Sequence, residues 1–74
     1  MNDVKQISYF ELLRLIKEGR QPKQLSYNLI RFYFRDDVDG YFTEYGKSLR
    51  MAIAENLTDT ELVEKRDIFY EEQE

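Results

Sequence analysis

The 74-residue chain contains no cysteine, no histidine and no tryptophan, with only one proline and three glycines. Without cysteine it can form neither a disulfide framework nor a thiolate metal site. Without histidine it lacks the commonest general base and the commonest transition-metal ligand. The glycines, Gly19, Gly40 and Gly46, lie too far apart to form a glycine-rich phosphate loop. We therefore expect no enzymatic activity and no cofactor.

Long apolar runs are also missing. No segment approaches the ~20 apolar residues that a membrane-spanning helix requires. The polar start MNDVKQIS does not resemble a signal peptide. The length predicts one small domain over residues 1–74, with residues 71–74 as a frayed acidic tail. We expect a cytoplasmic protein that does not contact the membrane.

The net charge of −4 is unevenly distributed along the chain. Residues 1–35 hold seven bases and three acids, a net charge of +4, whereas residues 36–74 hold four bases and twelve acids, a net charge of −8. Such asymmetry can mark an electrostatic partner surface, for example acids that compete with nucleic acid for a basic groove. Alternatively, the two halves fold together and neutralise each other, and that interpretation is the favoured one.

The first predicted element is a helix that begins after Ser8. Ser8 and Glu11 have the spacing of a capping box, and Gly19 with Pro22 ends the helix. Apolar side chains between these limits recur with helical spacing: Tyr9, Leu12, Leu13 and Ile16. A second helix is predicted over residues 47–57.

Residues 28–35 and 41–45 are predicted to form a β-hairpin, with Phe32 and Phe34 facing the core. A five-residue loop, DDVDG, would pair Phe34 with Phe42 and Arg35 with Tyr41. A four-residue loop would turn Phe42 away from the core, so the five-residue loop is favoured.

The C-terminal segment is ambiguous between helix and strand. Thr58 and Glu61 have capping-box spacing, while Val63, Ile68, Phe69 and Tyr70 suit a strand. A strand is favoured because a two-stranded ribbon alone would be marginal. The expected fold is α+β in the order α-β-β-α-β, with helices packed on a small antiparallel sheet.

The acids of the hairpin loop do not fit a calcium site. If Gly40 takes the sixth position of an EF-hand loop, Asp37 and Asp39 fall on ligand positions. However, Arg35 would then be first and Gly46 twelfth, where acids are required. Aspartate and glycine also suit a tight turn, so we predict a turn and no metal.

The outer face of this hairpin is the candidate partner-binding surface. The favoured register places five tyrosines and arginines there: Arg31, Tyr33, Arg35, Tyr41 and Tyr45. These residue types dominate binding hot spots. The face could be covered by a helix, bind a protein or a second copy of the chain, or bind single-stranded nucleic acid. Nucleic acid is the weakest of these because Asp36, Asp37 and Asp39 lie beside the patch.

The opening YFELLRLIKEGRQPKQLSYN resembles the start of small uncharacterised accessory proteins of Gram-positive phages and prophages. The matching residues are Leu12, Leu13, Leu15, Ile16, Glu18, Gly19, Pro22, Tyr27 and Asn28, with Leu57, Thr58 and Asp59 later. This sequence departs from the pattern in the hairpin RFYFRDDVDGYFTEY. The resemblance implies no catalytic residue. It implies a bacterial cytoplasmic protein that binds or inhibits a host or phage protein, such as a defence or nucleic-acid-handling factor.

Overall fold

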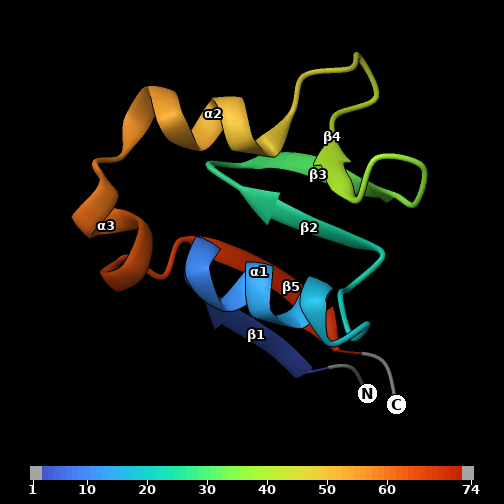
Figure 1. Ribbon diagram of the computed structural model, residues 1–74, viewed down its shortest axis with the longest axis horizontal. Coiled ribbons are helices and arrows are strands. Elements are labelled where there is room, and N and C mark those ends of the chain that lie inside the picture. The colour runs from blue at the N-terminus through green and yellow to red at the C-terminus, as the bar shows by residue number, and fades with distance from the viewer. Residues whose placement is uncertain (1–2, 73–74) are drawn as a thin grey trace.

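The computed structural model describes residues 3–72 and shows a small α+β domain (Figure 1). The elements in chain order are β1 Asp3–Ile7, α1 Tyr9–Lys17, β2 Gln24–Tyr27, β3 Ile30–Arg35, β4 Gly40–Phe42, α2 Leu49–Asn56, α3 Asp59–Glu64 and β5 Ile68–Glu72. The α+β class is confirmed, but the order differs from the predicted one. Strands β1 and β2 were not expected, and the ambiguous C-terminal segment forms both a helix, α3, and a strand, β5.

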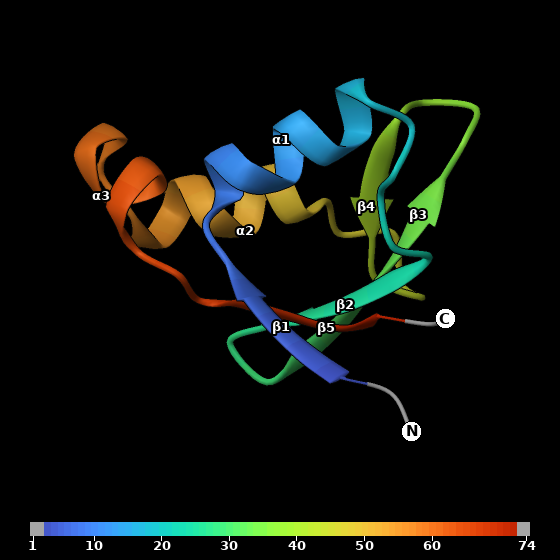
Figure 2. The ribbon, with the colours of Figure 1, turned by 90° about the horizontal axis from the view of Figure 1, so that it is seen from below.

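The five strands form one antiparallel sheet in the order β1-β5-β2-β3-β4. Strand β5, from the acidic half of the chain, lies between β1 and β2 from the basic half. Figure 2 shows all three helices on one side of the sheet. No helix in the described part of the chain is long and apolar enough to cross a membrane. The fold is thus a layer of helices on a layer of strands, with one sheet face left uncovered.

Helix α1 begins where its sequence predicts, but within residues 3–72 only the Ser8 half of the predicted capping box is present, and the Glu11 carboxylate lies 3.6 Å from the Arg66 guanidinium. The Ser8 hydroxyl accepts a hydrogen bond from the Glu11 backbone N–H at 3.2 Å, which satisfies one of the unpaired donors of the first turn. Gly19 adopts a φ of 73° just beyond the helix, where glycine is favoured. The buried stripe differs slightly from the predicted one. Leu12 is fully buried, with Tyr9, Leu15 and Ile16 partly buried around it, while Leu13 is exposed.

Helix α3 is short and depends on its cap. Thr58 and Glu61 form the predicted capping box, with each side chain bonded to the other residue's backbone N–H. Glu61 and Lys65, four residues apart, also form an ion pair at 3.9 Å. No residue of α3 is fully buried, but Leu62 is partly buried and packs against the core, so both the cap and this apolar contact support the helix.

The core lies between the helices and the inner face of the sheet. Its fully buried apolar side chains come from α1, β3, α2 and β5: Leu12, Phe32, Leu49, Ile53 and Ile68. Phe32 faces inward as its alternation with Arg31 and Tyr33 predicts. Residues 71 and 72, predicted as part of a frayed acidic tail, instead belong to strand β5, and residues 73–74 lie outside the described residues.

The predicted register of the β3–β4 hairpin is wrong by one residue. Arg35 pairs with Gly40, Phe34 with Tyr41, and Tyr33 with Phe42, so the loop has four residues, 36–39. Tyr41 therefore takes the core position that was predicted for Phe42. Its ring packs against Phe34 with centroids 5.2 Å apart. Its hydroxyl donates a 2.5 Å hydrogen bond to the Pro22 carbonyl oxygen, a tertiary contact that Phe42 could not make.

Candidate partner-binding surface

The sheet face opposite the helices, called the open face below, carries alternate residues of all five strands. The β-pairing places Gln6, Phe69, Ser26 and Arg31 on neighbouring strands in one row. Gln24, Tyr33 and Phe42 form a second row. Because side chains alternate along a strand, all of these point away from the helices and toward solvent. Exposed aromatic, arginine and amide side chains therefore share one continuous surface.

Three of the five predicted site residues, Arg31, Tyr33 and Arg35, lie on the open face. Tyr33 is 41% exposed, and both arginines are exposed. The Arg35 guanidinium lies 5.5 Å from the centroid of the Phe42 ring and 2.8 Å from Asp37. These two contacts hold Arg35 against the sheet and neutralise part of its charge. Arg31 forms no ion pair within residues 3–72 and remains available to an anionic group.

Phe42 and Phe69 are open-face residues that the sequence reasoning missed. Phe42 packs over Gly40, where an added Cβ would lie 3.3 Å from its ring. Phe69 is 42% exposed in the middle of the sheet, between Gln6 and Ser26. The alternation of buried Ile68 and exposed Phe69 could be predicted from the sequence once residues 68–72 were assigned to a strand. The sequence could not predict that β5 lies between β1 and β2.

Tyr41, the fourth predicted site residue, does not belong to this surface. It is 3% exposed and lies in the core, on the helix side of the sheet. Burial raises the pKa of its hydroxyl far above the usual value of 10.0, and the nearby Tyr70 hydroxyl adds to this effect. Tyr41 is therefore a structural residue that remains neutral and donates to Pro22.

Tyr45, the fifth predicted residue, lies in the loop between β4 and α2. Its side chain is 91% exposed. The loop backbone bonds to itself through Thr43, whose hydroxyl accepts from the Tyr45 and Lys47 N–H groups. Tyr45 is thus presented to solvent from a turn and is not aligned with the strand residues. The predicted surface is divided among the sheet, the core and a loop.

Two depressions border Phe69. One, of about 540 Å³, is bordered by three bases, Arg20, Lys23 and Arg31, and by Glu71. The other, of about 710 Å³, lies between the β2–β3 turn and the loop that leads into β5. Phe69 and Ser26 border both. Asn56 and Leu57, at the end of α2, also line the second depression, so it lies where the open face meets the helix layer.

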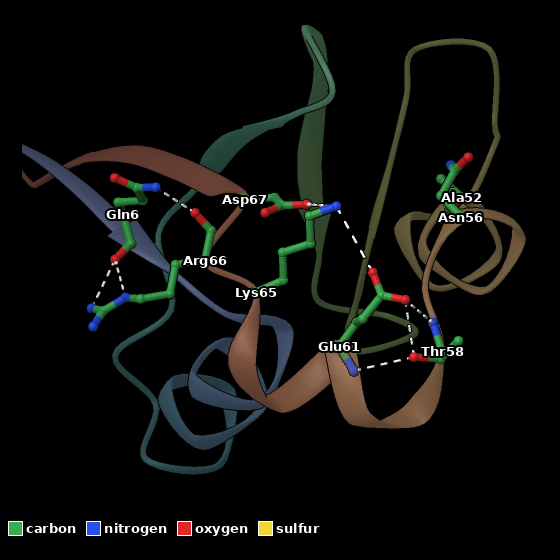
Figure 3. Close-up of polar contacts among 8 residues, drawn as sticks. All are labelled: Gln6, Ala52, Asn56, Thr58, Glu61, Lys65, Arg66 and Asp67. Carbon is green, nitrogen blue, oxygen red and sulfur yellow. Dashed lines mark hydrogen bonds and ion pairs between the residues drawn. The ribbon is translucent and has the colours of Figure 1, made fainter.

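The second depression has a fixed wall. Figure 3 shows how the residues before β5 are tied to β1 and α3. Gln6 donates to the Arg66 carbonyl oxygen at 2.6 Å, and the Arg66 guanidinium donates to the Gln6 carbonyl oxygen at 2.9 and 3.2 Å. Lys65 lies between Glu61 and Asp67, at 3.9 and 3.8 Å. The neighbouring bases are therefore committed to internal contacts.

No group of three or more potential metal-ligating side chains is found within residues 3–72. The loop acids Asp37 and Asp39 lie in the four-residue turn, where Asp37 pairs with Arg35. Comparisons of the chain with protein-family models, curated proteins and solved structures give no significant match. Inference about function therefore depends on the geometry of the open face.

Proposed function

We propose that this protein is a non-enzymatic binding module whose open face contacts another protein. The observation that carries the proposal is the arrangement of the sheet: helices cover one face, whereas the other presents Tyr33, Phe42 and Phe69 around Arg31. Half-exposed aromatics and arginine combine large contact area with polar ends, as hot-spot residues do. An uncovered aromatic face of this kind is typical of an interaction site.

Charge indicates what kind of protein surface fits. Arg20, Lys23 and Arg31 border one depression with a single acid, Glu71, although the whole chain carries a net charge of −4. A partner with acidic groups around an apolar centre would complement this face. The resemblance to phage accessory proteins leads us to propose that the partner is a host or phage protein of the bacterial cytoplasm. Binding would inhibit it.

Single-stranded nucleic acid is the second candidate, because aromatics on a sheet stack bases and arginines hold phosphates. Two observations count against it. Arg35, which would hold a phosphate, is already paired with Asp37 at 2.8 Å. Asp36 and Asp39 lie in the same loop, and their charge would repel phosphates from that end of the face.

Site-specific photo-cross-linking tests the proposal. A benzophenone side chain at position 33 or 69 probes the open face, and one at position 51 is the control, because Met51 is 62% exposed on α2, an element of the opposite layer. In nuclease-treated bacterial lysate we expect positions 33 and 69 to cross-link the same protein and position 51 not to. A cross-link to nucleic acid before nuclease treatment, to a second copy only, or to nothing would contradict the proposal.

A further inference from the structure

The turn between β2 and β3 contains an unusual residue. Tyr27 pairs with Ile30, so only Asn28 and Leu29 form the turn, with φ values of 52° and 66°. Positive φ at both central residues defines the two-residue turn that suits the twist of a β-hairpin. Asparagine is favoured at the first of these positions and glycine at the second. Leu29 therefore occupies a position where a branched, apolar side chain is disfavoured.

Burial among the described residues does not compensate for this choice. Leucine in the left-handed region brings its Cβ close to the following carbonyl oxygen, a strain that glycine avoids. Burial could offset the strain, but Leu29 is fully exposed, at 102%. The side chain thus destabilises the isolated domain and contributes no packing to it. Strained residues of this kind are concentrated where function requires them.

The surroundings of Leu29 belong to the candidate surface. Asn28 and Leu29 border the larger depression together with Phe69 and Ser26 of the open face. Its other wall is held by the contacts of Gln6 with Arg66. Leu29 therefore projects from a tight turn with a second apolar side chain, Phe69, bordering the same depression and a hydrogen-bonded wall opposite. The tight turn fixes the backbone at position 29, so a partner would meet this side chain at a defined place on the surface.

We propose that Leu29 is an anchor that inserts into an apolar pocket of the protein partner, with Phe69 packing at the pocket's rim. This inference rests on the proposed function and names the chemistry that the partner must present. An aliphatic side chain suits a concave apolar pocket. It does not stack on bases, so the anchor favours a protein over a single-stranded nucleic acid. Arg31, on the neighbouring strand, would face acids outside that pocket.

The inference predicts opposite effects of one substitution on stability and binding. Leu29→Gly removes both the strain and the apolar side chain. Its urea unfolding midpoint should therefore rise, while its affinity for the partner identified by cross-linking should fall roughly thirtyfold or more, as for a hot-spot residue. Leu29→Met keeps an apolar side chain of similar reach and should retain most of the affinity. Val38→Ala, at an exposed site in the β3–β4 loop, is the matched control and should change neither property.

The probe that finds the contact is a benzophenone side chain at position 29, used in the same nuclease-treated lysate. Cross-linking of position 29 to the protein reached from positions 33 and 69 supports the anchor. If positions 33 and 69 cross-link a protein and position 29 does not, or if Leu29→Gly binds as tightly as wild type, the anchor is wrong and the proposed function stands. If none of the three positions cross-links a protein, both are wrong.

Discussion

At the scale of the residue, the neighbouring aromatics Tyr41 and Phe42 lie on opposite sides of the sheet because side chains alternate along a strand, and a hydrogen bond favours Tyr41 on the core side. Either ring could have packed against Phe34. Only Tyr41 carries a hydroxyl that can donate to the Pro22 carbonyl oxygen, 19 residues earlier in the chain. Phe42 then falls on the open face, beneath the Arg35 guanidinium. One contact thereby changes the composition of the candidate surface.

The buried tyrosines predict how stability depends on pH. Burial raises the pKa values of Tyr41, Tyr9 and Tyr27. The Asp67 carboxylate raises the pKa of Tyr27 further. Above pH 10.0, the usual value, the unfolded chain releases these protons while the folded chain retains them. The contribution of these groups to stability is therefore fully present below pH 10 and is lost as pH rises through their folded-state pKa values.

Tyr41→Phe isolates the largest of these contributions. At pH 7 the variant should be about 1–2 kcal/mol less stable, because the Pro22 carbonyl oxygen loses its partner. Above pH 10 the stability of the variant should fall less steeply than that of wild type, so the difference in unfolding free energy between the two proteins should become smaller. Urea unfolding between pH 7 and pH 11 measures both effects, with Tyr45→Phe, an exposed site, as control. Parallel pH profiles for wild type and Tyr41→Phe would contradict this assignment.

At the scale of the element, β1 is held in the sheet by contacts with residues near the other end of the sequence. It is an edge strand whose first four residues, Asp3 to Gln6, are all exposed, so burial contributes little to its attachment. It pairs with β5 from Ile7↔Ile68 to Asp3↔Glu72. Gln6 and Arg66 add three hydrogen bonds at the end nearest the helices. The strand is therefore expected to open before the rest of the sheet.

Arg66→Ala tests this dependence. The change removes the guanidinium bonds to the Gln6 carbonyl oxygen and the 3.6 Å pair with Glu11. We expect a loss of about 1–2 kcal/mol, with faster hydrogen exchange of β1 amides than of β2 or β3 amides. Lys65→Ala removes only exposed ion pairs and should cost about 0–1 kcal/mol. Equal effects of the two variants on β1 exchange would show that Arg66 does not hold the strand.

At the scale of the whole molecule, the charge asymmetry of the sequence does not become two separate surfaces. Strand β5 of the acidic half is inserted into the sheet of the basic half, and Arg66 pairs with Glu11 across the two halves. Several acids are paired with bases near in sequence, such as Glu55 with Lys47. Of the bases that border the open face, Arg20 pairs with Glu18 and Arg35 with Asp37. Arg31 and Lys23 remain beside the aromatics, which favours an apolar contact over one dominated by charge.

This balance predicts a weak response to salt. If the open face binds a protein through its aromatics and Leu29, raising ionic strength from about 0.05 M to about 0.5 M should weaken binding less than about tenfold. If it binds single-stranded nucleic acid through Arg31, Lys23 and Arg20, three phosphate contacts should weaken it about a hundredfold over the same range. Titrations of the purified partner at several salt concentrations distinguish the two.

The sequence by itself determined the features that depend on residues close together in the chain. The caps at Ser8 and Thr58, the end of α1 at Gly19, and the alternation that buries Phe32 all depend on residues within a few positions of one another. The placement of Arg31, Tyr33 and Arg35 away from the core followed from the same alternation. Short-range hydrogen bonds and side-chain periodicity are sufficient for these features.

Only the tertiary structure decided the register of β3 and β4, the insertion of β5 between β1 and β2, and which side chains lie on the open face. Each depends on contacts between residues distant in sequence, such as Tyr41 with Pro22 and Gln6 with Arg66. Strand β1 has too little apolar pattern to be recognised without its partner. The strain at Leu29 also became visible only when Tyr27 and Ile30 paired, because the two-residue turn that joins them here has positive φ at both positions.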